Sequence, residues 1–312
     1  MTTTKNAVRA KFKMLDSVRG ALYAFCFAFF LVFTAMNAKT CQAAVVDSVE
    51  FCLRAIIPSI FPFMVLSDFL ASAFSGGKGR NVFTEVLGIS PYMSSAFITG
   101  NLCGFPIGVR MAARIFSEGK IEKDELEASI ALFNNPSCAY VISAVGVCMY
   151  DSIYDGVGLY ICILSATFIV GIFFREKRDK ANFTNDNTGQ TFDISESIKN
   201  AGLSCVAVSS YIIFFSYISC VLSLLINNDY ITAIISAFVE VGSGVKLISA
   251  LGLPRLAALP LTALALGFSG ISVHLQAFGV LPKEIRKKKY IIMKLCEGAV
   301  AMVLTLLFCL VT

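Results

Sequence analysis

The sequence predicts an all-α polytopic membrane protein, and three observations favour that class. Of the 312 residues, 56% are hydrophobic and only 15% are charged, which is not the balance of a soluble globular domain. Several windows of about 17 or more residues carry hardly a charge and could cross a bilayer core about 30 Å thick. Basic residues gather at the ends of these apolar runs, as they do beside the spans of membrane proteins.

The remaining composition excludes several other classes. The net charge of +5 comes from these flanking basic residues, so no nucleic-acid partner is expected. The 11 cysteines include no Cys-x-x-Cys pair and the chain has a single histidine, His274, so we expect no metal site and no cofactor. There is no P-loop, His-Glu-x-x-His motif or nucleophile elbow, so the chain is not expected to be an enzyme.

The N-terminal part carries two apolar runs long enough to cross a bilayer. Basic residues precede the run from Gly20 to Ala38, and the small residues after it would also suit a cleaved signal peptide. Because the run is longer than a usual signal core and more spans follow, we expect an uncleaved span with a cytoplasmic N-terminus. In the next run, Phe51 to Phe74, Pro58 and Pro62 must disturb the helix, because each removes a backbone donor.

The segment 82–109 is predicted to be a re-entrant hairpin. It leads into GNLCGFPIGVRMAARIF, Gly100 to Phe116, where three glycines, a proline and two arginines interrupt apolar sequence. Basic residues flank the segment on both sides, at Lys78, Arg80, Arg110, Arg114, Lys120 and Lys123. Positive charge marks the cytoplasmic side, so the segment should enter and leave the membrane on that side. Such a hairpin is tolerated only when it is buried in protein or lines a cavity.

A polar linker is expected to divide the chain into two halves. The span Leu126 to Val147 is interrupted by Asn134 to Ser137, and the span Gly158 to Phe174 returns to a basic loop. The stretch Arg175 to Asn200 is rich in Asn, Thr, Asp and Ser and is expected to be cytoplasmic. We therefore expect an N-terminal span and cytoplasmic tail (residues 1–47), a first repeat half (48–174), a cytoplasmic linker (175–200) and a second repeat half (201–312).

The second half resembles the first. After a span from Leu203 to Ile226, the segment Leu251 to Gln276 resembles Leu87 to Ala112, because each has Leu-Gly, then a proline, an apolar ascent and Gly-Phe with glycine close behind. Paired, interrupted apolar segments of this kind indicate the substrate site of a transporter. The orientation of the second segment stays open: an inverted repeat places it outside, whereas the basic Lys283 to Lys289 argues for the inside. Either Tyr230 to Ala250 is a full span, which adds one crossing and places that segment inside, or the positive-inside rule fails here.

The breaks themselves predict a polar site. A helix interrupted at mid-membrane leaves backbone groups that lipid cannot satisfy. A half-helix beginning near Pro106, and another after Ser269 and Gly270, would point free N–H groups and positive dipole ends into the protein. Two such termini facing each other would bind an anion or a carboxylate.

Side chains near the breaks have both structural and functional interpretations. Arg110 could pair with a substrate carboxylate or anchor the hairpin at the interface. Asn134, Asn135 and His274 could contact substrate or make buried hydrogen bonds between helices. Glu240 lies in an apolar run and could be functional or face water at the interface. The substrate-site candidates are Gly104, Phe105, Pro106, Gly108, Arg110, Asn134, Asn135, Glu240, Gly267, Ser269, Gly270, Ser272, His274 and Gln276.

Several of these motifs resemble the sporulation integral membrane protein YlbJ family, also called SpoVV. The elements are PSIFPFMVLS, Gly-Phe-Pro-x-Gly, Asn-Asn-Pro, the Glu240–Gly244 region and Gly-Phe-x-Gly-x-Ser-x-His-x-Gln, from about residue 48 to the end of the chain. That family is related to the Gate, or nucleoside-recognition, domain and is distantly similar to concentrative nucleoside transporters. The resemblance implies movement of dipicolinic acid, a planar aromatic dianion, across the outer forespore membrane during sporulation.

Two other functions stay open at this point. One is a nucleoside or nucleobase transporter, which would use Asn, Gln and Ser side chains more than Arg110. The other is a membrane scaffold for spore assembly that transports nothing, although a scaffold has no need of broken hairpins at mid-membrane. The expected partners are a small anionic substrate and the lipid bilayer, and homo-oligomerisation stays open.

Overall fold

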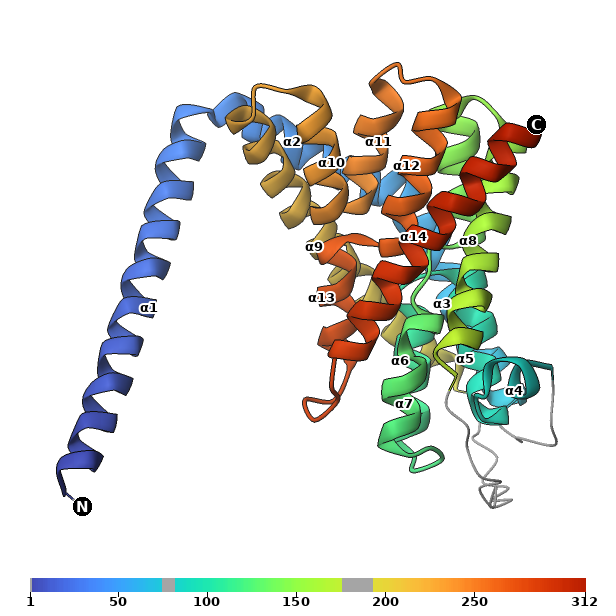
Figure 1. Ribbon diagram of the computed structural model, residues 1–312, viewed down its shortest axis with the longest axis horizontal. Helices are drawn as coiled ribbons and strands as arrows, with labels where there is room; N and C mark the ends of the chain where they lie inside the picture. Colours follow the sequence, from blue (N-terminus) through green and yellow to red (C-terminus); the bar gives the residue numbers. More distant parts are fainter. Residues whose placement is uncertain (1, 75–81, 176–192) are drawn as a thin grey trace.

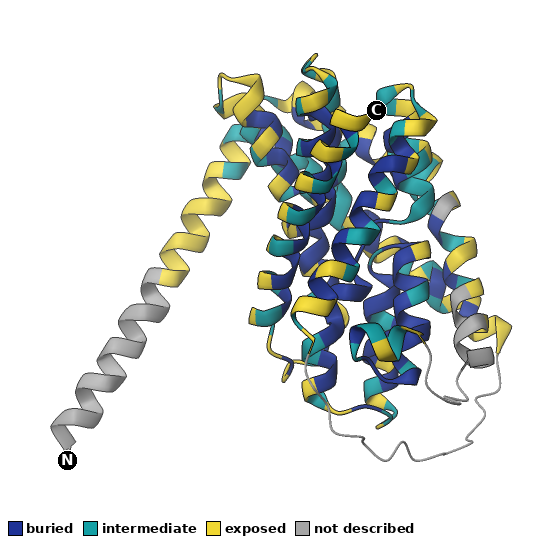
Figure 2. Cartoon of the chain, turned by 45° about the vertical axis from the view of Figure 1, so that its right-hand side comes forward, coloured by how far each residue is buried: buried dark blue, intermediate teal, exposed yellow. Residues whose placement is uncertain are grey.

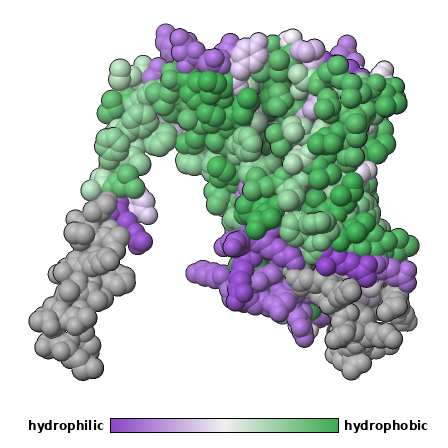
Figure 3. Space-filling view, in the orientation of Figure 1, coloured by the Kyte–Doolittle hydropathy of each residue, from purple (hydrophilic) through white to green (hydrophobic). Residues whose placement is uncertain are grey.

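The computed structural model describes residues 2–74, 82–175 and 193–312, and every regular element in these ranges is a helix (Figure 1). Five stretches are long and apolar enough to cross a membrane: Arg19–Met36, Ile153–Phe173, Ile194–Leu225, Arg255–Val280 and Lys288–Val311. A sixth is the bent pair Ala38–Ile56 and Ile60–Leu66. Figure 3 shows a hydrophobic band between two polar edges. The predicted all-α membrane class is thus confirmed.

Two ends of the helical bundle can be distinguished. One, here called the basic end, holds the turn at 118–122 and the loop at 281–287, with Lys120, Lys123 and the segment Lys283–Lys289. The opposite end holds the loops at 226–228 and 251–254 and the C-terminus (Figure 1). Lys78, Arg80 and most of the predicted linker, residues 176–192, lie outside the described residues. The described end of that linker is already helical, since α9 begins at Ile194.

The N-terminal elements are α1 (Thr2–Met36), α2 (Ala38–Phe51), the π-helix η1 (Cys52–Ile56) and α3 (Ile57–Phe74). Helix α1 stands apart from the bundle, as Figures 1 and 2 show, and its candidate span Arg19–Met36 contributes no buried residues. The hydroxyls of Thr34 and Tyr217 are hydrogen-bonded where α1 meets α9. The next span bends by 45° between Ile56 and Ile60. Pro58 lies at this bend, as the sequence predicts, while Pro62 is accommodated inside α3.

A helical hairpin is present where the sequence predicts one, although its two helices cover 91–117 and not 82–109. After α4 (Val82–Leu87), helix α5 (Pro91–Cys103) rises from the basic end and α6 (Ile107–Ser117) returns to it (Figure 1). The two helices touch through glycine: a Cβ at Gly108 would lie 2.5 Å from Gly100 Cα and 2.4 Å from the Phe133 carbonyl oxygen. Gly104 has a φ of +86°, which suits the turn at the hairpin tip.

The interrupted span that follows also agrees with the sequence. Its parts are α7 (Lys123–Ser129), the 3₁₀-helix η2 (Ile130–Phe133) and the π-helix η3 (Tyr140–Met149), and α8 (Ile153–Phe173) then crosses back. Residues 134–137 between η2 and η3 are not helical. The break lies beside the hairpin, because the backbone N–H of Phe105 donates to the carbonyl oxygen of Asn135 at 2.8 Å.

The second half differs from the prediction in where its hairpin lies. Its helices are α9 (Ile194–Leu225), α10 (Asp229–Val239), α11 (Val241–Ala250), α12 (Arg255–Phe268), α13 (Gly270–Val280) and α14 (Lys288–Val311). The chain reverses at Glu240, between α10 and α11, so 230–250 is a hairpin from the opposite end and not a full span (Figure 1). A Cβ at Gly244 would lie 2.0 Å from Ala237 Cα, so only glycine allows these helices to pack so closely.

The segment Leu251 to Gln276, which the sequence pairs with the first hairpin, belongs instead to one interrupted crossing. Helices α12 and α13 together form the candidate span Arg255–Val280. Ser269 and Gly270, with φ values of +79° and +75°, break the helix without reversing its direction. This crossing brings the basic segment Lys283–Lys289 to the same end as Lys120 and Lys123, which resolves the orientation that the sequence left open.

We expect Gly108→Ala to destabilise the first hairpin, because the added methyl group meets two backbone segments that cannot move independently. The cost should be about 1–3 kcal/mol, as in other overpacked contacts. The measurement is the thermal unfolding midpoint of the purified protein in detergent. Gly202→Ala in α9 is the control, since nothing lies within 4 Å of a Cβ there. Equal midpoints for the two variants would contradict the close packing.

Cysteine labelling should distinguish the two ends of the bundle. Asn227 and Lys283 are exposed and lie in the α9–α10 and α13–α14 loops, respectively. In a cysteine-free background, Asn227→Cys should react with an impermeant maleimide added outside cells, and Lys283→Cys should react only after permeabilisation. Labelling of both positions, or of Lys283→Cys alone, from outside would show that the orientation is wrong.

Candidate functional site

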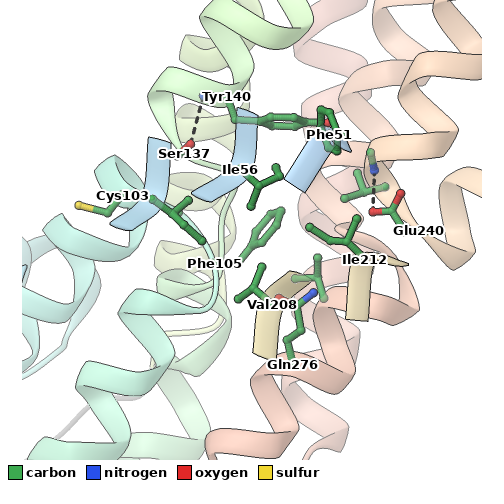
Figure 4. A pocket seen from close by; sticks show the side chains of 15 residues that line it. Phe51, Ile56, Cys103, Phe105, Ser137, Tyr140, Val208, Ile212, Glu240 and Gln276 are labelled. Atoms are coloured by element: carbon green, nitrogen blue, oxygen red, sulfur yellow. Dashed lines mark hydrogen bonds between the residues drawn. The ribbon is translucent and has the colours of Figure 1, made fainter. Parts of the chain in front are cut away.

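A cavity lies between the tips of the two hairpins (Figure 4). Its empty volume is about 600 Å³, with the open space at its mouth included. One wall is the tip of α5–α6 and another is the tip of α10–α11. The lining residues are Phe51, Ile56, Ile60, Cys103, Gly104, Phe105, Ser137, Tyr140, Val208, Ile212, Glu240, Val241, Gly242, Val273 and Gln276.

The cavity wall is mostly apolar and carries a few polar groups. Phe51 and Phe105 offer ring surfaces, while Tyr140, Glu240 and Gln276 supply a hydroxyl, a carboxylate and an amide (Figure 4). Tyr140 Oη and Gln276 Oε1 are buried and have no hydrogen-bond partner among the described residues. A buried polar atom without a partner costs free energy. These two atoms therefore favour a polar solute that completes their bonds.

Glu240 ends one half of the second hairpin and caps the other. Its Oε1 accepts from the N–H of Gly242 at 3.0 Å and its Oε2 from the N–H of Ser243 at 2.5 Å. The side chain is 3% exposed, which does not agree with the open interpretation as a water-facing residue at the interface. Because Glu240 already occupies the N-terminus of α11, the positive end of that helix is not free for another carboxylate.

The structure brings only some of the predicted site residues to the cavity. Gly104, Phe105, Glu240 and Gln276 line it. Three glycines make close backbone contacts instead: Gly108 within the first hairpin, Gly267 against Gly298 of α14, and Gly270 against the tip of α10–α11. Pro106, Ser269 and Ser272 lie beside the breaks but are not in the cavity lining.

Arg110 points away from the cavity. Its guanidinium donates to the backbone oxygen of Asn200 at 3.3 Å and to the hydroxyl of Ser204, so it joins α6 to α9 near the basic end. Among the lining residues, all of them described, none is Lys or Arg. The geometry favours the anchoring interpretation of Arg110 over direct pairing with a substrate.

Asn134, Asn135 and His274 belong to a second polar cluster, which is buried behind the first hairpin. Asn134 Nδ2 donates to Tyr290 Oη at 2.6 Å, and Tyr290 Oη lies 2.8 Å from His274 Nδ1. Asn135 Nδ2 donates to Asn101 Oδ1 at 2.8 Å and to Thr167 Oγ1 at 3.0 Å. The cluster therefore holds the break of one span against α5, α8, α13 and α14.

An ion pair completes this cluster, and the sequence interpretation missed it. Lys294 Nζ donates to Glu297 Oε2 at 2.9 Å, and both side chains are fully buried. A signal was present, since Lys-x-x-Glu lies inside the apolar run of the last span and charged residues within a span are rare. This signal is easily missed because the basic segment Lys283–Lys289 lies close by, so that Lys294 resembles one more basic residue at the end of the span.

Comparison with known proteins finds similarity to "Sporulation integral membrane protein YlbJ" of Bacillus subtilis (strain 168). The two chains are 24% identical over 336 aligned positions, which cover 90% of this chain and 81% of that relative. No family model matches the chain. No solved structure matches it either.

The similarity therefore runs along nearly the whole chain. It confirms the resemblance to the sporulation integral membrane protein YlbJ family that the motifs indicate, and the chain is an integral membrane protein related to that sporulation protein.

Proposed function

We propose that this chain is a membrane transporter whose substrate binds between the tips of the two hairpins. The observation that carries the proposal is the cavity itself, which lies where broken helices meet and contains two unpartnered polar atoms. Transporters build their sites from such discontinuous helices near the bilayer midplane. A scaffold for spore assembly would gain nothing from the cost of these breaks.

The order of elements supports a further part of this proposal, that the halves are inverted repeats. Span α2–α3, hairpin α5–α6, broken span α7–η3 and span α8 form one series. Span α9, hairpin α10–α11, broken span α12–α13 and span α14 repeat it. The first hairpin enters from the basic end and the second from the opposite end (Figure 1). An inverted repeat requires this arrangement, and the proposed distant similarity to concentrative nucleoside transporters requires it as well. Two such halves could expose one cavity alternately to each side.

The substrate that we propose is a small planar organic acid, and the resemblance specifies dipicolinic acid. The aromatic and aliphatic lining suits a flat ring, and Tyr140 Oη and Gln276 Oε1 suit polar substituents on it. The site of action that follows from the resemblance is the outer forespore membrane. Glu240 is the unfavourable feature for a dianion, because like charges at close range in an apolar site repel each other.

A second candidate, a nucleoside or nucleobase, is favoured by that same residue. A neutral heterocycle donates N–H or O–H groups that a carboxylate accepts well, and Gln276 and Ser137 add further polar contacts. The absence of Lys and Arg from the lining residues also suits a neutral solute. Glu240 therefore distinguishes the two substrate classes.

Glu240→Gln should separate these candidates, because it removes the charge and keeps the shape and one capping acceptor. Dipicolinate should bind the variant at least about tenfold more tightly, since the repulsion is lost. A nucleoside should bind it more weakly by a similar factor. Equilibrium binding of labelled dipicolinate, uridine and adenosine to purified protein measures both.

Ser249→Ala, at an exposed hydroxyl that bonds to the Lys246 carbonyl, is the control and should change neither affinity. Tighter dipicolinate binding supports the organic acid, and weaker nucleoside binding supports the second candidate. If none of the three solutes binds to the parent or to Glu240→Gln, the transporter proposal fails for both classes.

A further inference from the structure

The buried Lys294–Glu297 pair has a specific connection to the proposed substrate cavity. Both residues lie on α14, three positions apart, and both side chains are fully buried. Lys294 Nζ has three acceptors: Glu297 Oε2 at 2.9 Å, the Asn134 carbonyl oxygen at 2.9 Å and Asn135 Oδ1 at 2.8 Å. An ammonium group carries three hydrogens, so each has its own acceptor.

Two of these acceptors belong to the break in the neighbouring span. Residues 134–137 are not helical, so the carbonyl oxygen of Asn134 has no helical partner at this place in the membrane. The ammonium of Lys294 satisfies that carbonyl directly. The ammonium group thus occupies the position that a bound cation would occupy among these oxygens, and it is covalently attached to α14.

Asn135 connects Lys294 to the hairpin tip through hydrogen bonds. Its side-chain oxygen accepts from Lys294, and its amide nitrogen donates to Asn101 and Thr167. Its backbone oxygen accepts from the N–H of Phe105 at 2.8 Å. Phe105 lines the cavity. One chain of hydrogen bonds therefore leads from α14 to the cavity wall.

We propose that Lys294 is a positioning residue for the substrate cavity, because its ammonium holds the Asn134–Asn135 break and, through Asn135, the Phe105 tip of the first hairpin. This inference rests on the transporter function proposed above. Because both members of the ion pair lie on α14, the pair by itself joins that helix to nothing else, whereas the other two bonds of Lys294 go to the break. Glu297, held in turn by Thr167, compensates the buried positive charge.

The test is a neutral double variant, Lys294→Met with Glu297→Gln. Removing both charges avoids leaving one of them buried and unpaired, which would threaten folding itself. The main readout is hydrogen exchange at the Phe105 amide, obtained by comparing overlapping peptides that begin several residues before Gly104. Pro106 has no amide hydrogen and adds no signal. We expect the Phe105 amide to exchange at least about tenfold faster than in the parent.

A second readout is the affinity for labelled dipicolinate, which should fall by about tenfold as the cavity wall loosens. Exchange at residues 241–243, in the tip of the other hairpin, should stay within about twofold of the parent value, because the break does not hold that tip. If dipicolinate does not bind the parent, the proposed substrate is wrong, and the exchange measurement still decides whether Lys294 positions the tip.

The control is a second ion pair, which is partly exposed and joins two helices. Arg255 and Asp155 join α12 to α8 at 2.7 Å near the opposite end of the bundle, away from the cavity lining. Arg255→Met with Asp155→Asn should leave exchange at Phe105 unchanged. A folded Lys294→Met/Glu297→Gln variant with parental exchange at Phe105 and parental affinity would overturn the proposal.

Thr167→Val keeps the proposal testable if the double variant fails to fold. It preserves side-chain shape and removes the hydroxyl that bonds both Asn135 and Glu297. Exchange at Phe105 should rise by about threefold, in line with the loss of the neutral hydrogen bond from Asn135, which is the one that leads to the hairpin tip. No change in the folded Thr167→Val variant would then count against the proposal.

Discussion

The carbonyl of Asn135 and the N–H of Phe105 form the contact on which the architecture of the first half depends. Each group is freed where a helix ends inside the membrane, and lipid offers neither of them a partner. By bonding to each other at 2.8 Å they join the break of a crossing span to the tip of a re-entrant hairpin. The backbone can then be irregular at mid-membrane, and the irregular region becomes the wall of a cavity.

In the second half, the backbone groups that a helix break leaves unpaired find partners in a different way. The hairpin α10–α11 reverses at Glu240, and the carboxylate of that residue caps the N–H groups of Gly242 and Ser243. A charged side chain thus replaces the interhelical backbone contact of the first half. This difference explains why the cavity has an acidic wall on one side and an apolar, aromatic wall on the other. It also makes Glu240 the residue that distinguishes the two substrate classes proposed above.

Much of the fold could be predicted from hydropathy and from proline and glycine placement. The first hairpin and the interruption at Asn134–Ser137 follow from strong local signals, because glycine and proline weaken a helix, although Pro62 is accommodated inside α3. The hairpin at Glu240 has no proline, and a break without proline resembles an interfacial helix in sequence. The glycines from Gly267 to Gly270 indicate a break, and a break is present. The positive φ angles of Ser269 and Gly270 interrupt the helix between α12 and α13 without reversing the chain. Only the tertiary structure determines the direction in which the chain continues.

The site was predictable where backbone chemistry determines it and not where packing does. Gly104, Phe105 and Glu240 reach the cavity because they lie at the tips of the two hairpins, and Gln276 reaches it from within α13. Arg110 turns to α9, and Asn134, Asn135 and His274 turn to α14, because their partners come from segments far away in the sequence. The rotation of a helix about its axis selects those partners, and apolar sequence with little periodicity does not specify that rotation.

Uptake of radiolabelled dipicolinate into vesicles that contain only this protein tests the central claim most directly, namely that a solute crosses through the cavity. Ile212→Trp should fill the cavity, which Ile212 lines, whereas Leu310→Trp adds the same ring to an exposed, apolar position of α14. We expect saturable uptake by the parent and by Leu310→Trp, and no uptake by Ile212→Trp. Uptake by the parent no greater than by protein-free vesicles, or normal uptake by Ile212→Trp, would contradict it.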